Sequence, residues 1–112
     1  MSADLWVLLL AVMIQVESGG VPQINHREQA YGVLQIRQGA LDDVNQACGT
    51  RITLQDCLRN ETISRWVCVQ YAKLYGAKTM EEVARTHKGG PRGTSKVSTL
   101  AYWDRVKREL RK

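Results

Sequence analysis

The chain begins with a long apolar segment that predicts its first helix. Apolar residues run almost without interruption from Leu5 to Val16, and the pair Gly19-Gly20 follows shortly afterwards. Ser is a common helix cap and glycine a common helix stop, so Ser2 and the glycine pair predict a helix over Ala3–Ser18. Because this segment is apolar on nearly every face, we expect it to be the central helix of the fold.

Shorter elements follow along the rest of the chain. Val21–Gln29 predicts an irregular loop, and Tyr31–Ile36 predicts short extended structure. Thr79 and Glu82 have the spacing of a capping box at a helix start. Apolar spacing and end signals predict further helices near residues 40–47, from residue 53, over 62–76, over 80–86 and over 100–110. The glycine-containing loop His87–Ser98 is expected to be conformationally free, in a mostly α protein with a minor β element.

Length and charge narrow the class of protein. A chain of 112 residues suits one domain over residues 1–112. Sixteen Lys and Arg against eleven Asp and Glu give a net charge of +5, which favours a polyanionic partner such as nucleic acid, an anionic membrane face or an acidic cell-wall polymer. Much of the excess lies in Arg105–Lys112, where cations also complement a helix dipole. No zinc pattern or recognition helix is visible, so we expect no nucleic-acid partner.

The chain has three cysteines, so at most one intramolecular disulfide can form. Cys48 and Cys57 flank a short loop and form the better pair, while thiols packed in the core are the open alternative. Neither His26 nor His87 has a sequence context that suggests a thiol nucleophile. The histidines and cysteines also lack the spacing of metal ligands, and we expect no metal and no cofactor.

The first apolar segment has the length of a signal-peptide core, but it follows Asp4 rather than a basic region. No small-residue cleavage site comes after it. Ten apolar residues, Leu5–Ile14, are also too few to cross a bilayer. We therefore expect a buried helix, with no evident signal peptide and no stable membrane insertion.

Glu17 is the strongest candidate for chemistry. It stands at the end of the first predicted helix, where a negative charge is unfavourable beside the helix dipole, so its position needs another reason. A carboxyl group can protonate a glycosidic oxygen at neutral pH when apolar surroundings disfavour its charged form. The apolar run before Glu17 supplies such surroundings, and the position predicts a general acid.

A block of residues from 17 to 35 shares its spacing with a known family. The pattern E-S-x-x-x-P followed by G-A-x-G-L-M-Q resembles the core motifs of soluble lytic transglycosylases and goose-type lysozymes. Two later segments, 84–91 and 99–103, are similar to the A-Y-N-x-G loop and the T-x-x-Y stretch of that family. The residues of the first block that carry the resemblance are Glu17, Ser18, Pro22, Ala30, Gly32 and Gln35.

The resemblance implies a lysozyme-like fold and a protein that cleaves the β-1,4 bond between N-acetylmuramic acid and N-acetylglucosamine in peptidoglycan. A single carboxylate suits a lytic transglycosylase, in which Glu17 acts as acid and then base while the muramyl 6-hydroxyl attacks to give a 1,6-anhydro product. Two alternatives stay open: a goose-type-like muramidase that hydrolyses the bond, and a glycan-binding module with weak turnover. Hydrolysis needs a second carboxylate, and the candidates are Glu28, Asp42 and Asp43.

The same resemblance implies residues that bind the glycan. Gln35 is expected to hydrogen-bond a sugar hydroxyl or N-acetyl group. Tyr31 and Tyr102 offer ring faces on which a sugar can stack, although a tyrosine in such a position more often belongs to the core. Ser18 is expected either to bond the catalytic carboxylate or to cap the helix end.

His87 and Lys88 stand where the family commonly has Tyr-Asn. His87 is expected to act as a hydrogen-bonding ring in the cleft, and Lys88 to meet a muramyl or peptide-stem carboxylate. The partner implied is the peptidoglycan strand, met by a monomer that is periplasmic, secreted or delivered to the cell wall by a phage.

Overall fold

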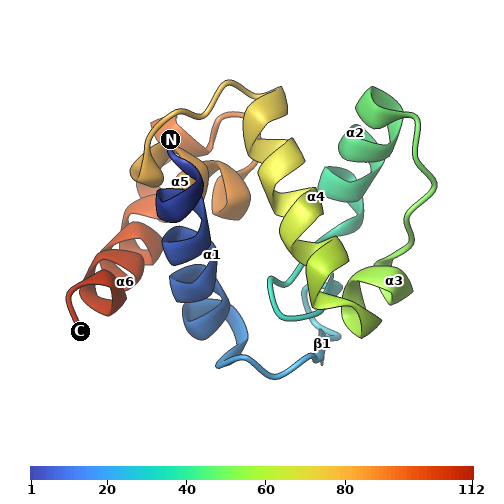
Figure 1. Ribbon diagram of the computed structural model, residues 1–112, viewed down its shortest axis with the longest axis horizontal. Coiled ribbons are helices and arrows are strands. Elements are labelled where there is room, and N and C mark those ends of the chain that lie inside the picture. The colour runs from blue at the N-terminus through green and yellow to red at the C-terminus, as the bar shows by residue number, and fades with distance from the viewer.

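Six α-helices, two short 3-10 helices and one small hairpin make up the computed structural model, which describes residues 1–112 (Figure 1). The protein is therefore mostly α with a minor β element, as predicted. The elements in chain order are α1 (Ala3–Ser18), β1 (Ile24–Asn25), β2 (Ala30–Tyr31), α2 (Gln38–Cys48), α3 (Leu54–Arg59), α4 (Glu61–Leu74), α5 (Met80–Gly89), η1 (Gly93–Ser95), η2 (Val97–Thr99) and α6 (Leu100–Leu110).

Side-chain caps and glycine stops define the helix ends. Ser2 Oγ accepts a hydrogen bond from the Leu5 amide at 3.2 Å, and Gly19 ends α1 in the left-handed conformation with φ of 66°. Thr79 and Glu82 form the predicted capping box at the start of α5. Local chemistry therefore determines where these helices begin and end.

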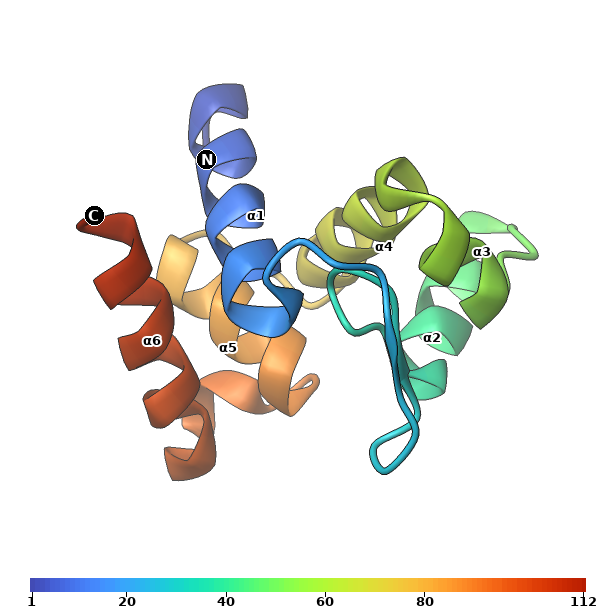
Figure 2. The same cartoon turned by 90° about the horizontal axis from the view of Figure 1, so that it is seen from below.

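The helices form two groups that meet at α4 and α5. On one side α6 packs against α1 and α5, and on the other α4 packs against α2 and α3. Figure 2 shows that the hairpin β1–β2 lies between the two groups. The antiparallel strands pair Ile24 with Tyr31 and Asn25 with Ala30. This arrangement leaves the end of α1, the hairpin and the end of α5 close to one another.

The turn after β2 passes very close to the end of α3. Gly32 has φ of +86°, and a Cβ there would lie 2.4 Å from the Cys57 carbonyl oxygen. The same oxygen accepts a hydrogen bond of 2.7 Å from Ser64 Oγ, which is fully buried. Only glycine fits this position, because a side chain there would collide with the backbone of α3. The turn thereby carries Leu34 and Gln35 toward α1 and α5.

Helix α1 is not the central helix that its apolar sequence predicted. Only Leu9, Leu10 and residues 12–14 of this helix are buried, and Leu5 and Val7 near its start are 43% and 63% exposed. Figure 2 shows the reason, because the start of α1 projects beyond the body of the molecule. The extended structure also differs from the prediction: β1 lies inside Val21–Gln29, and only the first residue of Tyr31–Ile36 is in a strand.

The segment His87–Ser98 is not the free loop that its glycines predicted. Helix α5 continues through Gly89, and η1 and η2 follow it. Gly93 is buried against α5, where a Cβ would lie 1.9 Å from the Arg85 carbonyl oxygen. The Arg85 side chain in turn donates to Thr99 Oγ1 at 2.8 Å and to the Lys96 carbonyl oxygen at 3.1 Å. Close packing and these hydrogen bonds fix the segment in place.

All three cysteines are free thiols, so the predicted Cys48–Cys57 disulfide is absent. Cys48 is exposed, whereas Cys57 and Cys68 are packed in the core. Burial, with a smaller effect from the nearby Asp56 carboxylate, raises the pKa of Cys57 to about 11. Packing of side chains therefore stabilises this fold without a covalent cross-link. None of the helices has both the length and the apolar character needed to cross a membrane.

Candidate active site

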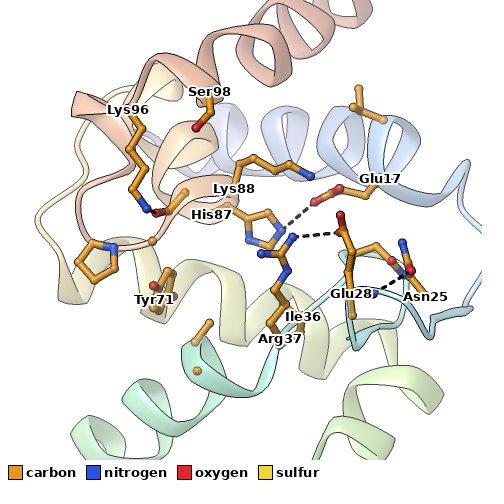
Figure 3. A pocket seen from close by; sticks show the side chains of 18 of the residues that line it. Glu17, Asn25, Glu28, Ile36, Arg37, Tyr71, His87, Lys88, Lys96 and Ser98 are labelled. Atoms are coloured by element: carbon orange, nitrogen blue, oxygen red, sulfur yellow. Dashed lines mark hydrogen bonds and ion pairs between the residues drawn. The ribbon is translucent and has the colours of Figure 1, made fainter.

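An open cavity of about 740 Å³ lies between the two helix groups (Figure 3). Its walls come from the end of α1, the hairpin and the turn after it, α2, α4, the end of α5 and the segment that leads into α6. The charged residues in its lining are Glu17, Glu28, Arg37, Asp43, Lys88, Lys96 and Arg105. Both a proton donor and cationic groups are thus available to a bound molecule.

Glu17 lines this cavity from the last turn of α1, and its side chain is only 10% exposed. The next residue, Ser18, ties the helix end to the turn after β2, because its hydroxyl donates to the Val33 carbonyl oxygen at 2.8 Å. Ser18 Oγ also accepts from the Gly20 amide at 3.2 Å. Ser18 does not line the cavity, and its hydroxyl bonds backbone groups at the helix end rather than the Glu17 carboxyl group.

His87 is the partner of Glu17. Its Nε2 lies 2.7 Å from the Leu34 carbonyl oxygen and 3.1 Å from Glu17 Oε2. A carbonyl oxygen can only accept, so Nε2 must carry a hydrogen, which also faces Oε2. When Glu17 is protonated, its proton therefore lies on Oε1. The imidazole thus occupies one carboxyl oxygen and leaves the other to donate, as Figure 3 illustrates.

The second nitrogen of His87 contacts a thiol that the sequence did not connect with it. Nδ1 lies 3.6 Å from Cys68 Sγ. Burial alone lowers the pKa of His87, but the Cys68 sulfur and the Glu17 carboxylate outweigh burial and hold that pKa well above its usual value. Cys68 is 2% exposed and lies outside the cavity lining. A histidine does stand beside a cysteine here, but no large substrate can reach the sulfur.

Two further carboxylates line the cavity. Glu28, on the hairpin, accepts from Arg37 Nη2 at 3.0 Å, and Asp43, on α2, accepts from the Tyr75 hydroxyl at 2.6 Å. Asp42 instead accepts from Gln38 within α2 and lies outside the cavity. Glu28 and Asp43 therefore share the cavity with Glu17, whereas Asp42 does not. No group of three or more His, Cys, Asp or Glu side chains is arranged to hold a metal ion.

The other predicted binding residues have mixed placements. Gln35 and Lys88 line the cavity, although the Gln35 amide nitrogen already donates to the Gly32 carbonyl oxygen at 3.0 Å. Tyr31 lies outside the lining. The prediction that a sugar stacks on Tyr102 is wrong, because this ring is 1% exposed beneath Lys88 and Arg105, with cationic groups at 5.6 and 5.7 Å from its centroid.

Sequence reasoning missed several cavity residues. Tyr71 belongs to the apolar stripe of α4, which predicts a core residue, and Arg105 belongs to the basic end of α6, which predicts a solvated helix face. Lys96 and Asn25 come from segments that the sequence predicts to be loops. Only their arrangement in space identifies these residues, since no motif marks them.

Comparisons with known proteins agree with this fold and site. No family model matches the chain. It is 33% identical to a lysozyme of Magallana gigas over 106 residues, which cover 87% of this chain and 74% of that protein. It is 31% identical to a lysozyme of Ostrea edulis over 110 residues, covering 89% and 77%. It also aligns with a chain in the crystal structure of Aeromonas hydrophila PliI in complex with Meretrix lusoria lysozyme, with a TM-score of 0.71, 27% identity, and coverage of 90% and 87%.

A helical fold with a small hairpin, in which a sheltered glutamate at the end of the first helix faces an open cavity, defines a lysozyme-like protein. The chain belongs to the lysozyme family, and its relatives named above are from bivalves. The lysozyme-like part of the resemblance is thus confirmed. Its narrower part, a soluble lytic transglycosylase or a goose-type lysozyme, finds no support in these matches.

Proposed function

We propose that the protein is a lysozyme that hydrolyses the β-1,4 bond between N-acetylmuramic acid and N-acetylglucosamine in peptidoglycan. The observation that carries this proposal is the placement of Glu17, whose side chain is 10% exposed, lines the cavity and contacts His87 through one carboxyl oxygen. The names of the relatives, which are lysozymes, support the substrate class. The proposal places the protein at a cell wall, as a secreted, periplasmic or phage-delivered enzyme.

Glu17 serves as the general acid in this mechanism. Oε1 delivers its proton to the glycosidic oxygen as the bond breaks. The carboxylate left behind keeps the hydrogen bond from His87 Nε2, 3.1 Å from Oε2. A donor that already faces the oxygen where negative charge develops stabilises that charge without reorganisation. His87 therefore favours proton transfer away from Glu17.

Glu28 is the second carboxylate that hydrolysis requires. Glycosidases commonly pair an acid with a second carboxylate that acts as nucleophile or base against the positive sugar ring. In Figure 3 Glu28 extends from the hairpin into the same end of the cavity as Glu17, with its carboxylate oriented by Arg37 at 3.0 Å. Asp43, on α2, accepts a hydrogen bond of 2.6 Å from the Tyr75 hydroxyl and is the alternative second carboxylate.

Cationic side chains in the cavity lining suit the acidic groups of peptidoglycan. Lys88 and Arg105 line the cavity, and neither forms an ion pair with a carboxylate of the protein. A muramyl or peptide-stem carboxylate is the anion that this substrate would bring to them. Gln35 keeps its side-chain oxygen free to accept from a sugar hydroxyl or N-acetyl group.

Mass spectrometry of the fragments released from purified peptidoglycan tests the proposal. The parent protein should release fragments with reducing muramic ends, Glu17→Gln should release none, and Glu28→Gln should release few. Asp42→Asn is the matched control, because it removes a carboxylate outside the cavity and should keep full activity. Fragments with 1,6-anhydromuramic ends would instead establish a lytic transglycosylase. No release by the parent, from a substrate that a control muramidase digests, would indicate a glycan-binding module.

A further inference from the structure

A thiol, an imidazole and a carboxyl group from three different helices form a chain of contacts beside the cavity. Cys68 on α4 lies 3.6 Å from His87 Nδ1, and His87 on α5 lies 3.1 Å from Glu17 on α1. The mechanism above uses only the carboxyl group and the Nε2 side of the ring. Cys68, which is 2% exposed and outside the cavity lining, has no role in it.

The sulfur is the polar partner of His87 Nδ1. Because Nε2 carries the hydrogen that faces Leu34 and Glu17, Nδ1 of the neutral ring is an acceptor. The ring is 8% exposed, and a buried acceptor without a donor is costly. The Cys68 thiol is the group placed to donate to it. In the protonated ring the roles reverse, and Nδ1–H donates to the sulfur.

Contacts at both nitrogens restrict how the ring can turn. A half-turn about the Cβ–Cγ bond of His87 would replace Nδ1 by a carbon at Cys68 and Nε2 by a carbon at Leu34. Such a turn would break the 3.6 Å and the 2.7 Å contact together, and it would leave Glu17 Oε2 without its donor. The Leu34 carbonyl and the Glu17 carboxyl group both contact Nε2, and Cys68 is the partner of Nδ1, so the share carried by Cys68 is open to measurement.

We propose that Cys68 is a positioning residue, whose sulfur holds the His87 imidazole in the orientation that keeps Nε2–H on Oε2 of Glu17. The effect of Cys68 on the reaction rate rests on the proposed function, whereas the effect of Cys68 on the His87 imidazole does not. Since Cys68 touches no part of the cavity, it affects the reaction through His87 alone. Tyr102 on α6 also faces this cluster, and the cationic groups of Lys88 on α5 and Arg105 on α6 lie over its ring.

Nitrogen-15 NMR of the histidine side chains tests the orientation directly. The chain has only two histidines, and His26→Gln assigns the signals of His87. In the parent protein the neutral ring should show a protonated Nε2 and a hydrogen-bonded Nδ1. In Cys68→Ala the Nδ1 signal should shift and the ring should titrate at lower pH, because the sulfur raises the pKa of His87. Cys68→Ser, which keeps a donor, should restore the parent pattern at least in part.

Cys57→Ala is the matched control, since it removes a second buried thiol, and this thiol does not contact His87. If Cys68→Ala does not fold, Cys68→Val fills the space without supplying a donor and takes its place. Unchanged His87 signals and titration in these variants would overturn the proposal, because they would show that the contacts at Nε2 suffice to orient the ring. Equal changes in Cys57→Ala would overturn it too, because they would reflect only the loss of a buried thiol.

Kinetics on peptidoglycan add a second readout. Cys68→Ala should lower kcat by roughly tenfold or more, the scale on which partners that orient an imidazole act, and leave KM nearly unchanged. The pH–rate profile should shift with the His87 titration, and Cys68→Ser should recover much of the rate. A lower kcat with an unshifted profile would contradict the positioning role. An inactive parent protein would refute the proposed function alone, since the NMR test needs no turnover.

Discussion

Replacing Gly93 by alanine tests how the segment after α5 is held. A Cβ at this position would lie 1.9 Å from the Arg85 carbonyl oxygen, 2.6 Å from the Arg85 carbonyl carbon and 3.0 Å from Thr86 Cα. All three atoms belong to the backbone of α5, so no flexible side chain can move aside. The segment must withdraw from α5 by roughly 1 Å, because carbon and oxygen atoms in contact need about 3 Å or more.

We expect Gly93→Ala to lower the free energy of unfolding by about 3 kcal/mol, at the upper end of the usual cost of overpacking. For a domain of this size, that loss corresponds to a fall in Tm of roughly 10–20 °C. Gly39→Ala is the matched control, since Gly39 lies in α2 without a positive φ, and a Cβ there would meet no neighbouring atom within 4 Å. It should raise stability by about 0.5–1 kcal/mol, because alanine favours helix.

Urea and thermal unfolding, followed by circular dichroism, measure both variants against the parent. Gly93 lies against the turn of α5 that precedes His87, so Gly93→Ala should also lower activity in the protein that remains folded at about 20 °C. The reasoning would be refuted if the free energy of unfolding of Gly93→Ala lay within about 0.5 kcal/mol of the parent value, which is the range of ordinary surface substitutions. It would mean that the segment yields easily and does not fix the end of α5.

Two further predictions concern the charges around the cavity. Lys88→Met should lower kcat/KM on peptidoglycan by roughly 2- to 5-fold, the scale of one exposed ion pair, and should leave activity on uncharged chito-oligosaccharides unchanged. Arg111→Met, which changes a residue outside the cavity, is the control. Equal losses on both substrates would contradict a carboxylate partner for Lys88. The raised pKa of His87 contributes stability that is complete below its unfolded value of about 6.5 and is lost as pH rises through the folded value. The urea midpoint of the parent should therefore fall more above neutral pH than that of His87→Gln, and parallel profiles would exclude the linkage.

Helix ends could be predicted from the sequence because they depend on neighbouring residues. The cap at Ser2, the stop at Gly19 and the capping box at Thr79 involve side chains within a few positions of the backbone that they satisfy. The free loop predicted at His87–Ser98 failed for the opposite reason. Its glycine at 93 serves a close approach to α5, and a close approach looks the same in sequence as a flexible turn.

The site could be predicted only in part, because its contacts join distant segments. Glu17 was identifiable from its unfavourable position at a helix end. Its contact with His87 spans 70 positions, and the contact of His87 with Cys68 joins two helices, so no spacing rule shows either. For Tyr102 the sequence predicted a binding residue that the structure places in the core, because an aromatic residue beside a motif can belong to either.

The hydrogen bonds of Arg85 bear on how the cavity meets a glycan. Because Arg85 holds the segment up to Thr99 against α5, this wall is already formed before any ligand arrives, and contact with it costs little conformational entropy. The facing hairpin, which carries Glu28, has only two residue pairs and an exposed tip. A glycan long enough to touch both walls meets Glu28 as well as Glu17, whereas a short one held at the α5 wall does not reach Glu28. Chain length of the substrate should thus govern catalysis more than it governs binding.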